Sequence, residues 1–500
     1  MVASTVNGPV LANGNVSNGD VNNIKDGLHQ NGNGVMPNGS LSRKSFPRNI
    51  RARELMKRNG TLWRDMTFKQ LLLSILVLNV AIFYYLPLTP YLFPVFYMLL
   101  AIPMLSGFLG FRNFLYVFWK HSGRKSKIDE YIEFVDDETK TRFSGQFIPI
   151  RDLYELYADG KLDFKRDVLE CMEHRDEFVS YKLQWWHLKF FFQKFVPEMF
   201  IHDQKQDREQ VCDHYNRGND FYRSFLGPMM VYTSGLQYTD GDSLEDMQLN
   251  KLREVCNKIA LQENEKHLDI GCGWGTLVNY AAEKVGSKST GVTIAQEQID
   301  WASEVTAEKG VKDKAKFLCM DYRDIPDEKY DKITCLEMSE HVGIKLYANF
   351  LDQVYDMLED DGIFFLQIAG LRRAWQWEDY MWAFFMDTYI FPGADASLPL
   401  TFPVAMLENA GFEVQAVETI GCHYSETILR WYQNWQKPEH KEEMISKYGK
   451  RLYRIWDIFL SWSTIIARQG NSTCYQIVAH KNMDAYPRKN FFKMRAKYNN

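Results

Sequence analysis

The sequence lacks several patterns that would each assign it to a large class of proteins. Its eight cysteines contain no Cys-x-x-Cys pair, so neither a zinc ribbon nor a dithiol redox site is indicated, and we expect no metal. Scattered cysteines in a long chain fit free thiols in a reducing compartment. The 59 basic and 64 acidic residues leave a net charge of −5, which gives no argument for nucleic-acid binding. The first residues also lack the apolar run of a secretory signal peptide.

Aromatic residues, in contrast, are plentiful, at 15% of the chain. Two explanations stay open on composition alone. One is a large aromatic core. The other is work at a bilayer surface, where Trp and Tyr are favoured.

The chain begins with polar and then basic residues. Residues 1–40 are rich in Asn and Gly and poor in apolar side chains, which predicts a disordered tail. Residues 41–68 form a basic arm, with Arg43, Lys44, Arg48, Arg51, Arg53, Lys57, Arg58 and Arg64.

A long uncharged run, Leu71–Phe111, follows the arm. It is too long for one membrane span of ~20 residues, and prolines interrupt it near the middle. We therefore predict two transmembrane helices in 69–111, at Lys69–Leu86 and Tyr91–Phe111. Basic residues flank both ends, so the positive-inside rule places both ends in the cytosol, as a hairpin. The alternative is a pair of buried core helices.

Residues 112–205 are predicted to be a linker and membrane-proximal helical region. Within them, Trp185–Phe195 mixes large aromatics with lysines. Such a helix could lie on a membrane surface or pack its aromatics against the next domain. The remaining boundaries are a catalytic domain at 206–482 and a basic C-terminal tail at 483–500.

The catalytic segment alternates strand-like runs with helical stretches. The predicted strands are Lys266–Ile270, Ser289–Ile294, Ala315–Met320, Lys332–Glu337 and Ile363–Ala369. Strands separated by helices predict an α/β fold with a mostly parallel sheet and helices on both faces.

The first predicted strand runs into the glycine-rich stretch Leu268–Gly275. Alternate glycines let the backbone turn sharply and approach a ligand at the carboxyl edge of a parallel sheet. The spacing is G-x-G-x-G, unlike the G-x-G-x-x-G of dinucleotide sites, which disfavours a dinucleotide oxidoreductase. Asp269, just before the glycines, suits a cationic ligand better than a phosphate. The combination matches the first motif of class I S-adenosylmethionine methyltransferases; the alternative is a tight turn without a ligand.

Other motifs surround this loop in order. They are Val211–Tyr222, Met230–Gly235, Gly291–Gln298, Asp321–Asp324, Met338–Gly343, Tyr389–Gly393, and His423-Tyr424 with Trp431-Tyr432. The run Asp207–Tyr432 thereby resembles the cyclopropane fatty acid synthase and mycolic acid methyltransferase family. The resemblance implies a class I, Rossmann-like methyltransferase that uses S-adenosylmethionine to methylate an alkene in a lipid chain.

The resemblance also implies roles for single residues. Asp269, Gly271, Gly273 and Gly275 would shape the cofactor site. Tyr232 and Thr233 would cover the methionine end of the cofactor. Thr293 and Gln298 would hold its ribose. Tyr322 and Arg323 would lie at the adenine edge. The residues expected at the reacting carbons are Glu340, Tyr424, Gln367 and Ser234.

Several of these positions depart from the family pattern. Cyclopropane-forming members hold a bicarbonate with a Cys, a Glu, a His, an Ile and a Tyr. Glu340 and Tyr424 match, but the Cys, His and Ile positions hold Ser234, Gln367 and Ala369. We therefore expect no bicarbonate requirement, and a methyl branch with a re-formed alkene instead of a ring.

The whole chain also resembles fungal sphingolipid C9-methyltransferases, with Met386–Ser397 close to their pattern. This implies methylation at C9 of the Δ8-unsaturated sphingoid base of ceramide. It also implies an integral membrane protein, in the endoplasmic reticulum, with its catalytic domain in the cytosol. Alternatives are a phospholipid acyl-chain methyltransferase or cyclopropane synthase, and a catalytically dead scaffold. The sequence does not fix the oligomeric state.

Overall fold

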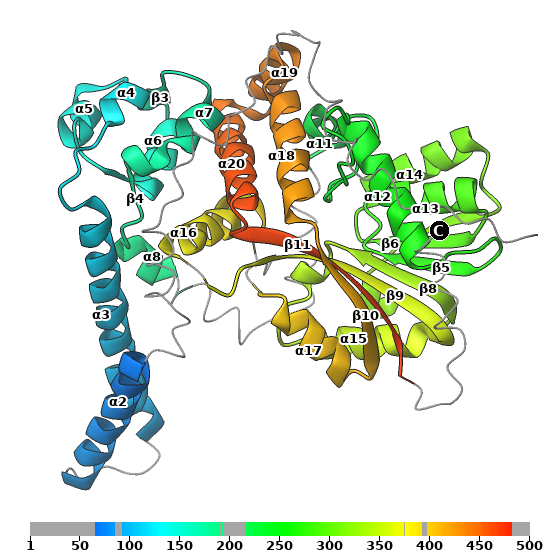
Figure 1. Cartoon of the computed structure of the whole chain (residues 1–500), viewed down its shortest axis with the longest axis horizontal. Helices are drawn as coiled ribbons and strands as arrows, with labels where there is room; N and C mark the ends of the chain where they lie inside the picture. Colours follow the sequence, from blue (N-terminus) through cyan, green and yellow to red (C-terminus); the bar gives the residue numbers. More distant parts are fainter. Residues whose placement is uncertain are drawn as a thin grey trace, which may run out of the picture. The chain divides into compact units, whose positions relative to one another are not determined.

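The computed structural model describes residues 66–85, 93–190, 193, 217–374, 376–392 and 398–482 (Figure 1). The predicted tails, 1–40 and 483–500, lie outside the described residues, as do most of the basic arm and the motif residues 211–216.

Two helices occupy the uncharged run, α2 (Met66–Tyr85) and α3 (Phe93–His121). Among the described residues, no helix is both long and apolar enough to cross a membrane. The prediction of two transmembrane helices in 69–111 is therefore wrong, and the predicted integral-membrane location and hairpin orientation fall with it.

The error has a physical reason. The prediction relied on the absence of charge from Leu71 to Phe111, whereas both helices extend beyond that run. They include Lys69 at one end and Arg112 and Lys120 at the other.

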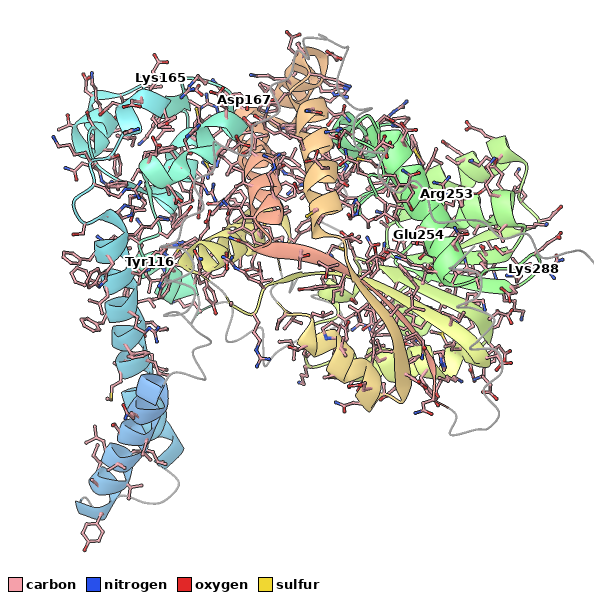
Figure 2. All side chains as sticks on the ribbon, in the orientation of Figure 1. Tyr116, Lys165, Asp167, Arg253, Glu254 and Lys288 are labelled. Atoms are coloured by element: carbon pink, nitrogen blue, oxygen red, sulfur yellow. The ribbon has the colours of Figure 1, made fainter. Side chains whose placement is uncertain are left out.

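The second half of α3 is attached to the segment that follows it. Asn113 donates from Nδ2 to the Tyr181 carbonyl oxygen at 2.9 Å and accepts from the Leu183 amide at 2.7 Å. Tyr116, on the same helix, is buried in the neighbouring core (Figure 2). Because a buried amide side chain is stable only when paired, these bonds fix the position of α3 against that segment.

Residues 128–190, within the predicted linker and membrane-proximal helical region, form small helices and two two-stranded sheets. The elements are α4 (Ile128–Tyr131), β1 (Ile132–Phe134), α5 (Asp137–Phe143), β2 (Ile148–Pro149), α6 (Ile150–Ala158), β3 (Leu162–Phe164), α7 (Val168–Glu173), η3 (Arg175–Glu177), β4 (Val179–Ser180) and α8 (Trp185–Phe190).

This segment shares one hydrophobic core with helices of the catalytic part. Several polar contacts join the two parts, and two of them illustrate how. Tyr432 donates to Asp167 at 2.8 Å (Asp167 is labelled in Figure 2), and the buried Arg175 donates to Glu378 at 2.6 Å. Loss of one partner of a buried ion pair strongly destabilises a protein. The Arg175–Glu378 pair therefore couples the two parts.

The aromatic helix α8 packs mainly against protein. His187 and Phe190 contact Phe384, with ring centroids 5.3 Å and 5.7 Å away. Trp185 remains exposed. Of the two interpretations of this helix, the contacts favour packing against the catalytic part.

The catalytic part is built on a seven-stranded sheet in the order β10-β11-β9-β8-β5-β6-β7. The strands are β5 (Lys266–Ile270), β6 (Lys288–Thr293), β7 (Ala315–Cys319), β8 (Tyr330–Leu336), β9 (Leu358–Leu371), β10 (Phe412–Thr419) and β11 (Ser472–Lys481). Neighbours from β7 through β9 pair in parallel, whereas β11 is antiparallel to both β9 and β10. The five predicted strands are all present, and β5 has the predicted bounds.

Helices cover both faces of this sheet, because successive side chains of a strand point to opposite faces. In β9, Ile363 and Phe365 join the core under α12 (Leu244–Lys258) and α13 (Thr276–Tyr280), while Phe364 and Leu366 join the core under α15 and α17. The other helices are η5 (Ala281–Val285), α14 (Gln296–Lys309), η6 (Tyr322–Asp324), η7 (Ser339–His341), α15 (Tyr347–Met357), α16 (Trp377–Phe385), η8 (Met386–Ile390) and α17 (Thr401–Asn409). The class I methyltransferase fold is thereby confirmed.

The core shared with residues 128–190 is rich in aromatic side chains of the catalytic part. It joins α11 (Asn219–Leu226), α18 (Gly421–Trp435) and α20 (Lys450–Arg468), with α19 (Pro438–Tyr448) between the last two. Phe221 makes an edge-to-face contact with Trp456 at 4.8 Å, and Trp435 stacks on Tyr453 at 4.9 Å. Much of the aromatic excess is therefore explained by a core.

Candidate active site

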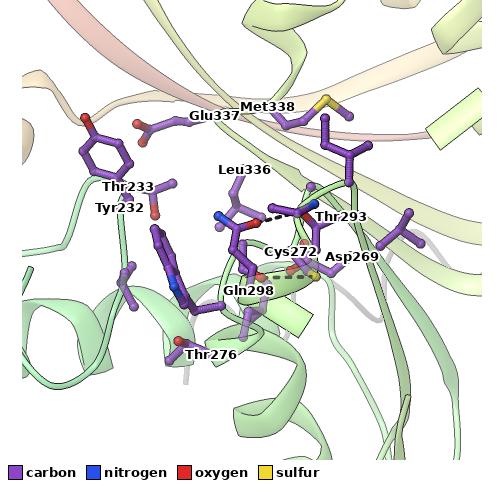
Figure 3. Close-up of a pocket in the computed structure, with 18 of the residues that line it drawn as sticks. Tyr232, Thr233, Asp269, Cys272, Thr276, Thr293, Gln298, Leu336, Glu337 and Met338 are labelled. Atoms are coloured by element: carbon purple, nitrogen blue, oxygen red, sulfur yellow. Dashed lines mark hydrogen bonds between the residues drawn. The ribbon is translucent and has the colours of Figure 1, made fainter. Parts of the chain in front are cut away.

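A cavity opens where the parallel strands β5, β6 and β8 end, the edge at which such sheets bind ligands (Figure 3). All the predicted cofactor-binding residues except Gly275 line it: Tyr232, Thr233, Asp269, Gly271, Gly273, Thr293, Gln298, Tyr322 and Arg323. The structure therefore brings together residues that lie far apart in the sequence.

The three glycines after β5 have different environments. All have positive φ, which favours glycine. A Cβ at Gly271 would lie 2.5 Å from the Met338 side chain, and one at Gly275 would lie 2.5 Å from the Phe317 ring. A Cβ at Gly273 would meet nothing within 4 Å. Gly271 and Gly275 thus allow close packing, while Gly273 leaves open space beside the cavity.

Asp269, at the carboxyl end of β5, is buried among polar groups of the sheet. Its Oδ1 accepts from the Thr334 hydroxyl at 2.7 Å. Burial raises the pKa of Asp269 to about 6, and Thr334 and Lys251 only partly oppose that effect. The carboxylate is therefore charged at neutral pH and close enough to the cavity to attract a cation.

Lys251, a residue that the sequence did not single out as part of the site, lies across the cavity on α12. A capping box between Ser243 and Asp246 begins this helix. The Lys251 ammonium donates to Thr233 Oγ1 at 2.7 Å. Burial lowers the pKa of Lys251 to about 8, against the attraction of Glu337 and Asp269. The cavity thus offers both a cation and an anion to a bound ligand.

Two hydrogen-bonded pairs, Thr293–Gln298 and Arg323–Asp321, line another part of the cavity. Thr293, at the end of β6, donates to Gln298 Oε1 at 2.7 Å, which orients the amide of the first turn of α14. The Arg323 guanidinium donates to the Asp321 carboxylate at 2.8 Å and 2.7 Å and lies 5.3 Å from the Tyr322 ring centroid. The predicted adenine edge is therefore a flat, polar surface.

The four predicted catalytic residues lie behind the cavity wall, and none of them lines the cavity. Glu337, which does line it, connects two of them. Its Oε1 accepts from the Ser234 amide at 2.9 Å and from Gln367 Nε2 at 2.6 Å. Tyr424 lies close enough that the charge of Glu337 adds to burial in raising the pKa of its phenol.

Glu340 lies deeper, with a side chain that is 6% exposed. Its Oε1 accepts from the Ala369 amide at 2.6 Å, and among the described residues its buried Oε2 has no hydrogen-bond partner. Burial, and then the charge of Glu337, raise the pKa of Glu340 to about 8. Glu340 is therefore a neutral acid at pH 7.

The sequence prediction omitted Glu337 because the matched motif begins at the next residue, Met338. One signal was present, since an acidic residue at the carboxyl end of a buried parallel strand lies at the edge where such sheets bind ligands.

Known families and proteins match much of this chain. A family model described as mycolic acid cyclopropane synthetase matches residues 202–477. The sphingolipid C9-methyltransferase of Komagataella phaffii is 47% identical over 416 residues, covering 79% of this chain and 83% of that protein. Sphingolipid C9-methyltransferase 2 of Gibberella zeae is 49% identical over 364 residues, covering 72% of this chain and 70% of that protein.

Solved structures show the same fold. The cyclopropane synthase MmaA2 from Mycobacterium tuberculosis has a TM-score of 0.52 at 24% identity, covering 55% of this chain and 98% of that chain. The mycolic acid cyclopropane synthase CmaA1, complexed with SAH and CTAB, has a TM-score of 0.52 at 24% identity, covering 56% of this chain and 100% of that chain.

The fold and the site define a class I methyltransferase. Within that class, the chain belongs to the cyclopropane synthase family and to its sphingolipid C9-methyltransferase group, as the sequence motifs indicated.

Proposed function

We propose that this enzyme transfers a methyl group from S-adenosylmethionine to C9 of a Δ8-unsaturated sphingoid base in ceramide, and that a proton is then lost to re-form the alkene. The observation that supports it most is the identity of 43–49% with relatives that are named sphingolipid C9-methyltransferases. A phospholipid acyl-chain methyltransferase or a cyclopropane synthase is not favoured, because the bacterial fatty acid relatives are only 28–29% identical.

The cavity residues fit this cofactor. Its methionine end is a zwitterion, which suits the opposite charges of Asp269 and Lys251. The space beside Gly273 admits a ligand to the backbone, and Tyr322 offers a flat surface to a base. When bound, S-adenosylmethionine supplies an electrophilic methyl group.

The protein's own residues have three tasks in such a reaction. They must hold the alkene against the methyl group, since alignment of the reactants contributes much of the rate. They must exclude water from a positive charge on the lipid chain. They must also stabilise that charge, for which aromatic faces and carboxylates are suited. Tyr232 and Glu337, which line the cavity, have the positions and chemistry for the last task, with Tyr424 close to Glu337.

Bicarbonate, which cyclopropane-forming members use, should be unnecessary here. Two of the positions that would hold it, Ser234 and Gln367, already donate to Glu337. A turnover rate that falls several-fold in bicarbonate-depleted buffer would refute this part of the proposal.

The function is tested by incubating the purified enzyme with S-adenosylmethionine and a Δ8-unsaturated ceramide. Mass spectrometry should show a gain of one methylene mass in the sphingoid base, with the double bond retained and a branch at C9. The matched control is a ceramide without the Δ8 bond, which should not react. Methylation confined to phospholipid acyl chains, or a cyclopropane product, would contradict the proposal.

A further inference from the structure

Glu337 has an unusual backbone conformation and a carboxylate that lines the cavity. The transfer of a methyl group does not itself require either feature. It follows β8 directly and has a φ of 53°, a left-handed conformation that is strained for a residue with a side chain. Strained residues of this kind persist where the surroundings hold them, often at active sites. The strain directs a carboxylate into the cavity wall, on the side where Tyr232 and Thr233 lie (Figure 3).

One oxygen of this carboxylate is held by a fixed set of donors. Besides Ser234 and Gln367, the Cys474 thiol lies 3.5 Å from Oε1. Gln476 donates to Gln367 Oε1 at 2.9 Å, so the Gln367 amide is oriented with its nitrogen toward Glu337. All three contacts fall on Oε1, and Oε2 has no hydrogen-bond partner among the described residues.

The two neighbouring carboxyl groups lie in different surroundings. Burial raises both pKa values, but the donors and Lys251 oppose this effect at Glu337, while at Glu340 the charge of Glu337 adds to it. Surroundings that push two acids apart in this way assign them the roles of base and acid. The donors on Oε1 therefore make Glu337 the member of the pair that is better suited to carry a negative charge and to accept a proton.

From this geometry we infer that Glu337 is a catalytic base: its Oε2 removes the hydrogen from the lipid carbon that has received the methyl group. The inference rests on the proposed function. The new carbon–carbon bond leaves a cation on the adjacent carbon. As Glu337 takes the proton, the electrons of the broken C–H bond form the alkene and the carboxylate becomes a carboxylic acid, which releases the proton to water after the product leaves.

The inference also explains the departures from the ring-forming pattern. Ser234 and Gln367 replace residues that hold a bicarbonate base in cyclopropane-forming members, and here they hold a carboxylate of the chain itself. A base fixed at a different point removes a different proton, so the product is a branched alkene instead of a ring.

The first test compares Glu337→Gln, Glu337→Asp and Glu359→Gln, the last an exposed carboxylate as control. Loss of a general base typically lowers the rate 10²–10⁴-fold, so we expect a loss of about 100-fold or more in turnover for Glu337→Gln. Glu337→Asp should be intermediate and Glu359→Gln unchanged. Cofactor affinity, measured by calorimetry, should stay within about threefold of the wild type.

Chemical rescue separates this role from a structural one. Glycine suits the positive φ of residue 337, and Glu337→Gly leaves space beside the Ser234 and Gln367 donors. Formate should therefore accelerate Glu337→Gly at least about tenfold and should not accelerate Glu337→Gln, whose amide fills the space. A substrate deuterated at C9 should lose its label in the wild-type reaction.

Three results would overturn the inference. They are a Glu337→Gln enzyme with near wild-type turnover, retention of the C9 deuterium in the product, and a Glu337→Gly enzyme that binds cofactor but does not respond to formate. A wild-type enzyme that does not methylate the sphingoid base would instead overturn the proposed function, and the role of Glu337 with it.

Discussion

Thr334 on β8 donates its only hydroxyl hydrogen to Asp269 on β5, at 2.7 Å, across the parallel pair of strands. Thr334 must then accept from His267 Nε2, 2.9 Å away, because burial lowers the pKa of His267 to about 3 and leaves its ring with one N–H. His267 Nδ1 in turn accepts from Ser289 at 3.1 Å. A chain of buried polar groups inside the sheet thus sets the position of the cavity carboxylate.

Removing the first donor of this chain should weaken cofactor binding. Thr334→Val keeps the side-chain shape and leaves Asp269 Oδ1 and His267 Nε2 without their partner. An unsatisfied buried group costs about 1–3 kcal/mol, so we expect S-adenosylmethionine to bind roughly tenfold more weakly by calorimetry. Thr419→Val, at an exposed position on β10, is the control and should bind as the wild type does. Unchanged affinity in Thr334→Val would show that the chain does not position Asp269.

Cofactor affinity should depend on pH near the pKa of Asp269. Burial raises that pKa to about 6, so Asp269 is an anion above pH 6 and becomes neutral below it. The dissociation constant should therefore rise as the pH falls from 8 to 5, by up to about tenfold for each unit below the pKa. Asp269→Asn should bind weakly at all of these pH values. Parallel curves for the two proteins would assign the dependence to another group.

Alanine substitutions at Gly273 and Gly275 should differ in their effect on the stability of the protein. Gly273→Ala places a methyl group in open space beside the cavity, so it should weaken cofactor binding and cost only the ~1 kcal/mol of a positive φ. Gly275→Ala drives a methyl group against Phe317 and Ala302, so it should also lose ~1–3 kcal/mol to overpacking. Thermal midpoints and calorimetry on both variants measure the difference. A lower midpoint for Gly273→Ala than for Gly275→Ala would contradict the assignment.

Glu340→Gln should lower turnover while leaving cofactor affinity nearly unchanged, because Glu340 lies near Glu337 and outside the cofactor cavity. Steady-state kinetics and calorimetry on the same preparation test this. A large loss of cofactor binding with normal turnover at saturation would contradict the placement.

The same substitution should raise stability at alkaline pH. The pKa of Glu340 is about 8 in the folded chain against an ordinary 4.5, so the folded state holds an extra proton between these values. Its contribution to stability is present below pH 4.5 and is lost as the pH rises toward 8. The thermal midpoint of Glu340→Gln relative to the wild type should therefore increase from pH 5 to pH 8. A difference that stays constant with pH would show that Glu340 is not buried as a neutral acid.

The catalytic domain was largely predictable because its signals are local. The strand before the glycines has the predicted bounds, and its motif residues come together because parallel strands share a carboxyl edge. The contacts of Glu337 were not predictable, since they come from Ser234, Gln367 and Cys474, which lie 103, 30 and 137 residues away. No local pattern encodes such distant partners.

The N-terminal helices were predicted wrongly although the sequence signal for them was local. The uncharged run between Leu71 and Phe111 was a local signal, but absence of charge is not the same property as a long apolar helix. Asn113, just beyond that run, is a buried polar residue whose two partners lie about 70 residues away. Such contacts hold a polar residue inside α3, and a local run of uncharged residues does not reveal them.

β11 has a consequence for how the protein is made. Residues 472–481 form a strand that lies between β9 and β10. These two strands therefore cannot join one sheet until the ribosome has synthesised residues 472–481. Until then β9 presents a long unpaired edge, and Glu337 lacks Cys474 and the Gln476 that orients Gln367. The active site should therefore form only after residues 472–481 have been synthesised, and a chain stopped before residue 472 should aggregate instead of showing partial activity.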